Sequence, residues 1–453
     1  MGSKVKIGFI AMSGVRAHNK ELTELGLTLP GFVERNKIIA SLPSLGLMTL
    51  AGMTPDDFDV EYLEVPDIEA LTSLPGDFDA VAISSFSAQI KEAYLLADSY
   101  RDIGTKVVLG GLHVSAVPDE ATRHADSVVL GEGEPIWPML VSDLRRGELK
   151  SIYDSRDKSF DLADAPMPAF HLLDINKYNR LTVQTQRGCP WRCDFCAASI
   201  RISPIYKIKP VDKVIGEIRR IKEIWPHPFI EFADDNTFVR KTHSKHLLRA
   251  LIKEHIRWFT ETDVSVAEDD ELLHLMHESG CAQVLIGFES PSLIGLNGLE
   301  ERVNWKAKQL DRYSRAIARI QDHGITVNGC FILGLDGTGR ESFDDIWNFV
   351  RESGLYEVQI TILTPFPGTP LYNRLKTERR LLQENSWELC TLFDVNFRPT
   401  LMTVSELESG FRNLAEKLYS ADVTKERRER YRKRWRSLPD SNNNIKHKRR
   451  ARA

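Results

Sequence analysis

Short apolar runs alternate with amphipathic segments in the first third of the chain. Valine-rich and isoleucine-rich runs predict strands at 5–12, 58–65, 78–85, 105–111 and 126–135. Between them, IKEAYLLADSYRDIG at 90–104 has apolar residues at helical spacing and ends in glycine. Short apolar strands separated by helices are typical of a parallel sheet that is covered on both faces. We therefore expect a doubly wound, Rossmann-like α/β domain over residues 1–150.

A second α/β series follows a proline-containing stretch without sustained periodicity, residues 151–180, which we interpret as a linker. Six strand-like runs begin at residues 180, 229, 257, 282, 325 and 356, and helical segments separate them. Six successive βα steps predict a partial (β/α)6 barrel over 181–375, with function on the loops that follow the strands. A helical extension is expected over 376–424, and a basic, disordered tail over 425–453.

Glycine and serine gather where three strands of the first domain end. Ser84 and Ser85 follow one predicted strand, Gly110 and Gly111 the next, and Gly131 and Gly133 the one after. Glycine lets a backbone approach a ligand closely, and serine supplies hydrogen bonds. These positions indicate a ligand crevice at the carboxyl edge of the sheet. Ordinary strand-to-helix turns are the alternative.

Charge is distributed unevenly along the chain. Lys425 to Ala453 contain 13 Lys and Arg and 3 Asp and Glu, a net charge of +10, which leaves −14 for the preceding residues of a chain that carries −4. The basic segment is either a solvated tail or a contact for phosphates or an anionic membrane surface, and the acidic remainder argues against specific nucleic-acid binding. No apolar run approaches the ~18 residues of a membrane span, so a cytoplasmic location is expected.

Three of the six cysteines fall within eight residues, spaced C-x3-C-x2-C. They are Cys189, Cys193 and Cys196, and the next cysteine in the chain is Cys281. A structural zinc site and a closed iron–sulfur cube usually need four ligands. Three thiolates without a fourth ligand nearby indicate a cluster with one open iron, which is the property of a reacting metal site.

With Phe195 directly before the third cysteine, this loop resembles the signature of the radical S-adenosylmethionine (radical SAM) enzymes. The resemblance implies a [4Fe–4S] cluster on the three cysteines, with the open iron binding SAM. In that family an electron from the cluster cleaves SAM, and the resulting 5′-deoxyadenosyl radical abstracts hydrogen from an unactivated carbon. The predicted barrel agrees with the family's partial barrel.

Other strand ends are similar to the family's SAM contacts. The resemblance implies that Asp234 or Asp235, in FADDN, holds the SAM amino group, although the usual Gly-Gly-Glu is absent. Glu289 and Ser290, in GFESPS, are expected at the ribose or carboxylate, and Gly334 near adenine. The alternative for each carboxylate is a helix cap or a surface ion pair.

The first domain resembles the cobalamin-binding domain that one large radical SAM subgroup carries, a subgroup that includes hopanoid methylases. PSLGLMTLAG, GGLHVSAVPDE and GEGEP carry this resemblance. The D-x-H-x-x-G motif, whose histidine binds cobalt in many cobalamin proteins, is absent. His113, in GGLHVS, is a candidate cobalt ligand, but a structural hydrogen bond is its more common role.

The leading hypothesis is therefore a cobalamin-dependent radical SAM methyltransferase that acts on an unactivated carbon of a lipid or natural product. The alternative is radical dehydration, cyclisation or C–C coupling with the first domain as a scaffold. A non-catalytic iron–sulfur protein is a third class. Expected partners are a small-molecule or lipid substrate, a reductant such as flavodoxin or ferredoxin, and a peripheral membrane contact through the basic tail. No individual catalytic residue is predicted.

Overall fold

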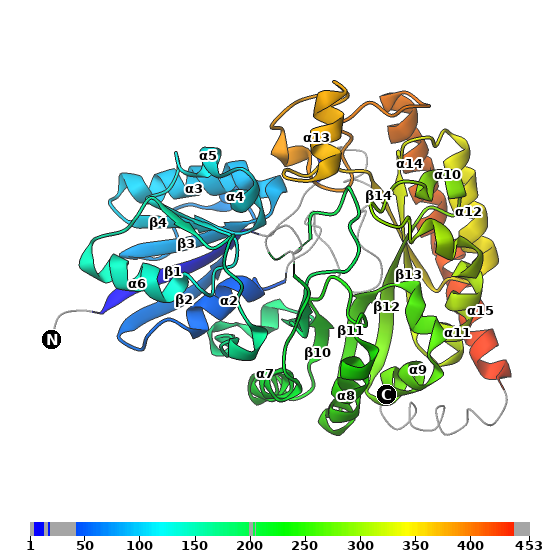
Figure 1. Cartoon of the computed structure of the whole chain (residues 1–453), viewed down its shortest axis with the longest axis horizontal. Coiled ribbons are helices and arrows are strands. Elements are labelled where there is room, and N and C mark those ends of the chain that lie inside the picture. The colour runs from blue at the N-terminus through cyan, green and yellow to red at the C-terminus, as the bar shows by residue number, and fades with distance from the viewer. Residues whose placement is uncertain (1–3, 13–16, 19–41, 199–202, 204, 439–453) are drawn as a thin grey trace.

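Two parallel six-stranded sheets dominate the computed structural model, each with its own helices (Figure 1). The structure describes residues 4–12, 17–18, 42–198, 203 and 205–438. No helix in these ranges is both long and apolar enough to cross a bilayer. Both predicted α/β series are confirmed.

The first sheet has the order β2-β1-β3-β4-β5-β6, and all its strands are parallel. Helices α2 and α6 cover one face, whose core includes Phe9 and Trp137. Helices α3, α4 and α5 cover the other, whose core includes Ile83 and Leu109. The elements are β1 (Val5–Met12), α2 (Leu45–Gly52), β2 (Phe58–Glu64), β3 (Ala80–Ser85), α3 (Ile90–Asp102), β4 (Lys106–Gly110), α4 (Leu112–Ala116), α5 (Pro118–Ala121), β5 (Ser127–Leu130), α6 (Trp137–Arg146) and β6 (Ile152–Asp154).

The sixth strand, β6, lies in the stretch expected to be linker. It pairs with β5 because Tyr153 is buried and its hydroxyl donates to Asp143 at 2.7 Å. A three-residue run is too short to show a period, so no sequence pattern predicts this strand. Beyond it, the connection contains the short 3-10 turns Leu162–Asp164, Phe170–Leu172 and Ile175–Lys177.

The second sheet has the order β14-β13-β12-β11-β10-β7, again parallel throughout, and forms the partial barrel. Its helices pack on the outer surface (Figure 1). The elements are β7 (Leu181–Val183), β8 (Gln186–Arg187), β9 (Lys207–Ile208), α7 (Val211–Ile224), β10 (Phe229–Phe232), α8 (Lys241–Leu251), β11 (Arg257–Thr262), α9 (Asp270–Glu278), β12 (Cys281–Glu289), α10 (Leu293–Leu296), α11 (Tyr313–Asp322), β13 (Thr326–Leu333), α12 (Glu341–Ser353), β14 (Glu357–Ile362) and α13 (Pro370–Thr377).

The C-terminal region corrects one expectation. It contains α14 (Val404–Tyr419) and α15 (Ala421–Ser437), so residues 425–437, expected to be disordered, are helical. Tyr431 and Arg427 are buried against the barrel, and Arg428 donates to Glu357 at 2.6 Å. This basic run thus forms a helix because the side chains on one of its faces contact the edge of the sheet. The rest of the expected tail, 439–453, lies outside the described residues.

Candidate functional site

The three predicted metal ligands line one cavity inside the partial barrel. Their loop begins and ends at a short antiparallel ribbon, in which Gln186 pairs with Ile208 and Arg187 with Lys207. Further along the loop, Cys193 forms an isolated bridge with Glu300. The ribbon and the bridge hold the loop over the carboxyl ends of the barrel strands, where the fold class places its chemistry.

Burial raises the pKa of Cys189 and of Cys193, each to about 12. Metal binding displaces thiol protons, so buried thiols of this kind are stabilised when a positively charged cluster core replaces those protons. Within the described residues, no three His, Cys, Asp or Glu side chains lie close enough to hold a single metal ion. A [4Fe–4S] cube takes each of its cysteine ligands on a different iron, and the three cysteines that line this cavity supply three such ligands.

Asp234 and Asp235 have different surroundings although they are adjacent. Asp235 lines the cavity, and its Oδ2 accepts a hydrogen bond from the Gly188 N–H at 3.1 Å. Asp234 is buried and accepts hydrogen bonds from the backbone N–H groups of Thr185 and Gln186 at 2.8 and 3.1 Å, and from two threonine hydroxyls. Burial raises the pKa of Asp234 to about 6 despite these hydrogen bonds. Its carboxylate therefore fastens the start of the cysteine loop and is not among the groups that line the cavity.

Glu289, at the end of β12, lines the same cavity and has a positive φ of 62°. Lys306 Nζ donates to its carboxylate at 2.7 Å and to the Gly287 carbonyl at 2.8 Å. Burial alone would lower the pKa of Lys306, but Glu289 raises it above the ordinary value. A non-glycine residue at positive φ is uncommon and is consistent with a side chain aimed for function.

Two other predicted SAM contacts do not line the cavity. The Ser290 hydroxyl accepts from the Ser292 N–H at 3.1 Å, within its own turn. A Cβ at Gly334, whose φ is 84°, would lie 2.8 Å from Phe397 and 2.9 Å from Leu407. Gly334 therefore makes room for the C-terminal region to pack.

Sequence reasoning missed several groups in this cavity. Glu261, on β11, faces the open space of the cavity deep inside the barrel, where desolvation by the surrounding protein, followed by the charges of neighbouring carboxylates, raises its pKa to about 8. Trp191, inside the cysteine loop, stacks on Trp305 with ring centroids 4.4 Å apart. The inward alternation of β11 is the signal that could have found Glu261. The tryptophan pair joins residues 114 positions apart, and no local pattern predicts it.

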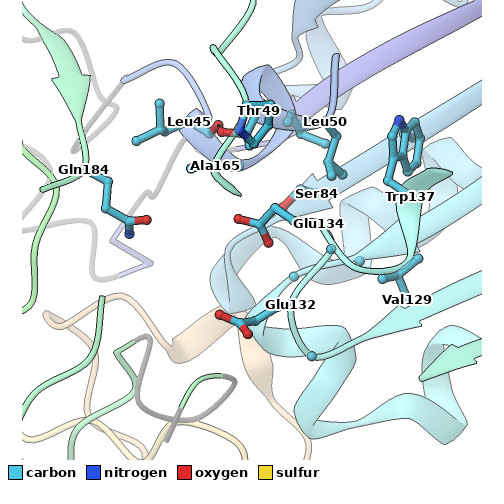
Figure 2. Close-up of a pocket in the computed structure, with 18 of the residues that line it drawn as sticks. Leu45, Thr49, Leu50, Ser84, Val129, Glu132, Glu134, Trp137, Ala165 and Gln184 are labelled. Carbon is cyan, nitrogen blue, oxygen red and sulfur yellow. Dashed lines mark hydrogen bonds between the residues drawn. The ribbon is translucent and has the colours of Figure 1, made fainter. Parts of the chain in front are cut away.

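A second pocket lies between the two domains (Figure 2). Five of the six predicted strand-end residues line it: Ser84, Gly110, Gly111, Gly131 and Gly133. The sixth, Ser85, instead donates to the Phe86 carbonyl at 2.9 Å. The far wall is formed by Gln184, Arg187, Lys209 and Ala233 of the barrel domain.

The shape of this interdomain pocket suits a flat cofactor with an aromatic tail. Ala82, Val108 and Val129, small side chains of the sheet, form one wall, α2 with Leu50 forms another, and Trp137 lies at its end. Gly111 and Gly131 have φ of 105° and 84°, and they keep the strand ends free of side chains. The pocket therefore fits a corrinoid, whose ring and nucleotide tail need a carboxyl-edge crevice.

His113 is not one of the residues that line this pocket. It is 2% exposed, its Nδ1 lies 3.0 Å from the Ser87 hydroxyl, and its ring meets Trp387 edge-on at 5.4 Å. Burial lowers the pKa of His113 to about 4. The geometry therefore gives His113 a place in domain packing and not at the cobalt.

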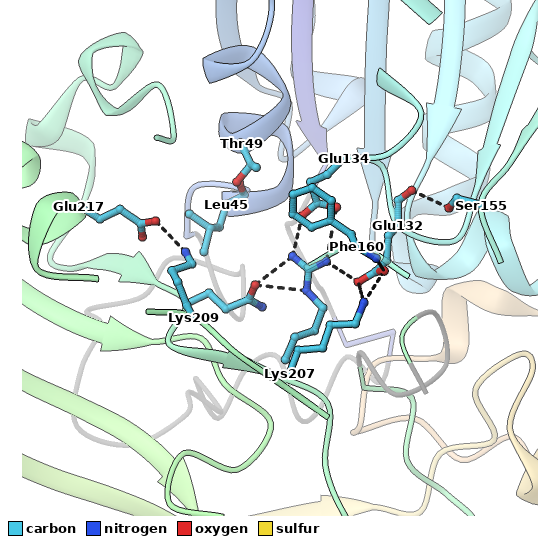
Figure 3. Close-up of polar contacts among 11 residues, drawn as sticks. Leu45, Thr49, Glu132, Glu134, Ser155, Phe160, Lys207, Lys209 and Glu217 are labelled. Carbon is cyan, nitrogen blue, oxygen red and sulfur yellow. Dashed lines mark hydrogen bonds and ion pairs between the residues drawn. The ribbon is translucent and has the colours of Figure 1, made fainter. Parts of the chain in front are cut away.

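A buried ion cluster crosses the interdomain boundary beside the pocket (Figure 3). Arg187 donates to Glu132 at 2.7 Å and to Glu134 at 2.6 Å, and Lys207 donates to Glu132 at 2.6 Å. The two cations come from the ribbon beneath the cysteine loop, and the carboxylates come from GEGEP after β5. On another side, Trp387 Nε1 donates to Glu120 at 2.9 Å and joins the C-terminal region to the first domain.

Three family descriptions match successive parts of the chain. The radical SAM superfamily matches residues 183–350, a B12 binding domain matches 36–141, and a domain of unknown function, DUF4070, matches 369–452. The first match contains the three cysteines, and the second ends within α6.

Curated relatives extend over most of the chain. A bacteriochlorophyllide d C-12(1)-methyltransferase of Chlorobaculum tepidum is 29% identical, over 85% of this chain and 84% of its own. An uncharacterized methyltransferase of Synechocystis is 30% identical, over 79% of this chain and 67% of its own. A hopanoid C-2 methylase of Rhodopseudomonas palustris is 27% identical, over 78% and 67%.

Among solved structures, the fold is similar to that of TsrM from Kitasatospora setae, a radical SAM methyltransferase solved with cobalamin and a [4Fe–4S] cluster bound. The TM-score is 0.61 at 15% identity, over 83% of this chain and 75% of TsrM. The chain therefore belongs to the radical SAM superfamily. Within it, the protein is a member of the cobalamin-dependent radical SAM methyltransferases, enzymes whose cofactors are a [4Fe–4S] cluster, SAM and cobalamin.

Proposed function

We propose that this enzyme methylates an unactivated carbon of a large, mostly apolar ring system, such as a polycyclic lipid or a tetrapyrrole. One observation carries the proposal. Ala233 lines the interdomain pocket and Asp235, two residues further on, lines the barrel cavity. A single strand end thus separates the two sites, so a methyl group carried in one would be close to a substrate carbon activated in the other.

Each site contributes its own residues. Cys189, Cys193 and Cys196 hold the cluster, while Asp235 and Glu289 receive the positively charged groups of SAM. With both cofactors bound, the cavity supplies radical formation from SAM and the pocket supplies a methyl group on cobalt. Lys306 keeps Glu289 in place through its 2.7 Å hydrogen bond. The inner wall, with Leu285, Ile332 and Thr361 among its side chains, limits the water around the reacting groups and so strengthens the electrostatic contacts to SAM.

The substrate class is supported by the lining of the cavity and by the relatives. Trp191, Trp305, Phe195, Phe366 and Leu392 contribute aromatic and aliphatic surface to the cavity. Flat apolar rings bind such surfaces through burial and stacking. Two relatives are named for ring substrates of this kind, a bacteriochlorophyllide and a hopanoid.

The test is a comparison of metabolites from a deletion strain and its parent by mass spectrometry. We expect an apolar ring compound to be replaced in the deletion strain by a species lighter by one CH2 unit. Purified enzyme with cluster, hydroxocobalamin, SAM and a reductant should then methylate that species, forming S-adenosylhomocysteine from the SAM that donates the methyl group and 5′-deoxyadenosine and methionine from the SAM that is cleaved. Turnover by protein that retains no corrin would contradict the proposal.

Two partner interactions belong to the same proposal. A low-potential donor such as flavodoxin or ferredoxin reduces the cluster. Exposed Lys425, Arg432 and Arg436 share one face of α15, which is turned away from the buried Tyr431, and approach an anionic membrane surface. Sedimentation with phosphatidylserine vesicles, but not with phosphatidylcholine vesicles, would support this contact. Equal sedimentation with both would contradict it.

A further inference from the structure

The two glutamates that follow β5 have unequal partners. Glu132 is 2% exposed and accepts hydrogen bonds from Lys207 at 2.6 and 2.8 Å, from Arg187 at 2.7 Å and from the Phe160 N–H at 3.2 Å. Within the described residues, the hydrogen bonds to the Glu134 carboxylate come from Arg187 alone, at 2.6 and 3.4 Å. Glu132 is therefore fixed from several sides, whereas the position of Glu134 depends on one cation.

Arg187 connects this carboxylate to the metal loop. Its guanidinium also donates to the Gln184 side chain at 2.9 and 3.2 Å. The next residue, Gly188, has a φ of 89° and directly precedes Cys189. A Cβ at Gly188 would lie 3.3 Å from the Ile205 carbonyl, so the loop is tightly packed where it leaves the ribbon. A displacement of Arg187 is therefore passed to the backbone that carries the first cysteine.

Glu134, labelled in Figure 2, lines the interdomain pocket, and Arg187 is also among its lining residues. A carboxylate has about four lone-pair sites, and Arg187 occupies only part of them. The remaining sites can accept amide N–H groups, which a corrin ring carries around its rim. A ligand in the pocket also excludes water from the ion pair, and a lower local dielectric strengthens the attraction between the two charges.

We propose that the Glu134–Arg187 pair couples the two sites, so that a corrinoid in the interdomain pocket increases the affinity of the barrel cavity for SAM. This inference rests on the proposed function, because it requires both ligands to bind. Arg187 acts as a positioning residue: it is not among the residues that line the barrel cavity, and it orders the start of the loop that carries the cysteines. Coupling is reciprocal, so SAM must increase the affinity for the corrinoid by the same factor.

The experiment measures the SAM dissociation constant by equilibrium dialysis, with and without saturating hydroxocobalamin. The enzyme carries its reconstituted, oxidised cluster, and no reductant is present, so SAM binds without cleavage. In the wild type we expect hydroxocobalamin to tighten SAM binding about fivefold. In Glu134→Gln the ratio should fall close to one, because the amide keeps the shape of the side chain and loses its charge. Arg187→Lys should behave in the same way, since an ammonium cannot bridge two carboxylates as a fork.

Glu148→Gln is the matched control. Glu148 is 66% exposed and accepts from Arg146 at 2.7 Å on the surface of the first domain. This variant should keep the wild-type ratio. The ratio of the two SAM dissociation constants is measured at saturating hydroxocobalamin, so a lower affinity of the pocket for corrin does not by itself change this ratio.

The outcomes separate the coupling from the function on which it rests. If hydroxocobalamin binds the wild type but leaves SAM affinity unchanged, the coupling is overturned and the proposed function stands. If Glu134→Gln keeps the fivefold effect, the pair is not the coupling element. If the wild type binds no hydroxocobalamin, both proposals fail together.

Discussion

The carboxylate of Asp234 and the backbone N–H of Thr185 are 2.8 Å apart, and this hydrogen bond joins the end of β10 to the start of the cysteine loop. Asp235, the next residue, directs its side chain into the cavity instead. Asp234 thus holds the loop in place, and Asp235 faces the cavity.

Substitution should separate these two roles. Asp234→Ala leaves buried N–H groups without an acceptor, so we expect a loss of folding stability of about 1–3 kcal/mol. Asp235→Asn should leave stability nearly unchanged and weaken SAM binding at least severalfold. Thermal unfolding and SAM dialysis on both variants check this. Equal SAM affinity in Asp235→Asn and wild type would remove Asp235 from the SAM site.

Iron content should depend on the cysteine loop alone. Replacing Cys189, Cys193 and Cys196 together by Ala should abolish the anaerobically reconstituted cluster, because the cube then has no protein ligand. Cys281→Ala and Cys390→Ala are the controls, since both thiols are buried outside the loop. Iron and sulfide assays with electron paramagnetic resonance of the reduced protein provide the measurement. An intact cluster in the triple variant would refute the assignment.

Glu261 should make the stability of the iron-free protein dependent on pH. Its folded-state pKa, raised to about 8, lies above the ordinary value of 4.5, so the folded state retains a proton that the unfolded state releases between these values. Wild-type stability should therefore fall as pH rises from 4.5 to 8 and level off above that. Glu261→Gln removes this slope, so its advantage in Tm over the wild type should be larger at pH 8 than at pH 5. Parallel Tm profiles for the two proteins would contradict the raised pKa.

Adding one methyl group at position 110 should reduce the amount of corrin that the protein retains. A Cβ there would make only ordinary contacts, 3.6 Å from Val129, but it would project into the interdomain pocket. We expect Gly110→Ala to fold normally and to retain less hydroxocobalamin after desalting. Gly216→Ala on α7 is the control, because its Cβ would lie 3.7 Å from Met167 outside the pocket. Absorbance of the corrin ring is the readout, and equal retention by the two variants would exclude Gly110 from the site.

Local patterns were sufficient for the strands, the cysteine loop and most of the glycine-lined pocket, because each depends on period, spacing or strand ends. They could not separate Asp234 from Asp235. Successive residues at a strand end point to opposite sides, and which side holds the ligand depends on a neighbouring strand. Nor could they show that Gly334, which has a positive φ, makes room for Phe397, 63 residues further on.

No local sequence pattern predicts the interdomain ion cluster. Glu132 and Arg187 are 55 residues apart and belong to different domains, so the residues around either one do not predict the ion pair. The helix formed by the basic run of α15 was not predicted, because composition does not show that Glu357, at the edge of the sheet, accepts a hydrogen bond from Arg428. In both cases a charged side chain has a partner that only the tertiary structure brings close.

Hydrogen bonds and ion pairs join the first domain to the rest of the molecule, among them those of Arg187 with Glu134 and of Trp387 with Glu120. The interdomain pocket takes one wall from each domain, so its dimensions depend on these contacts between the domains as well as on the two sheets.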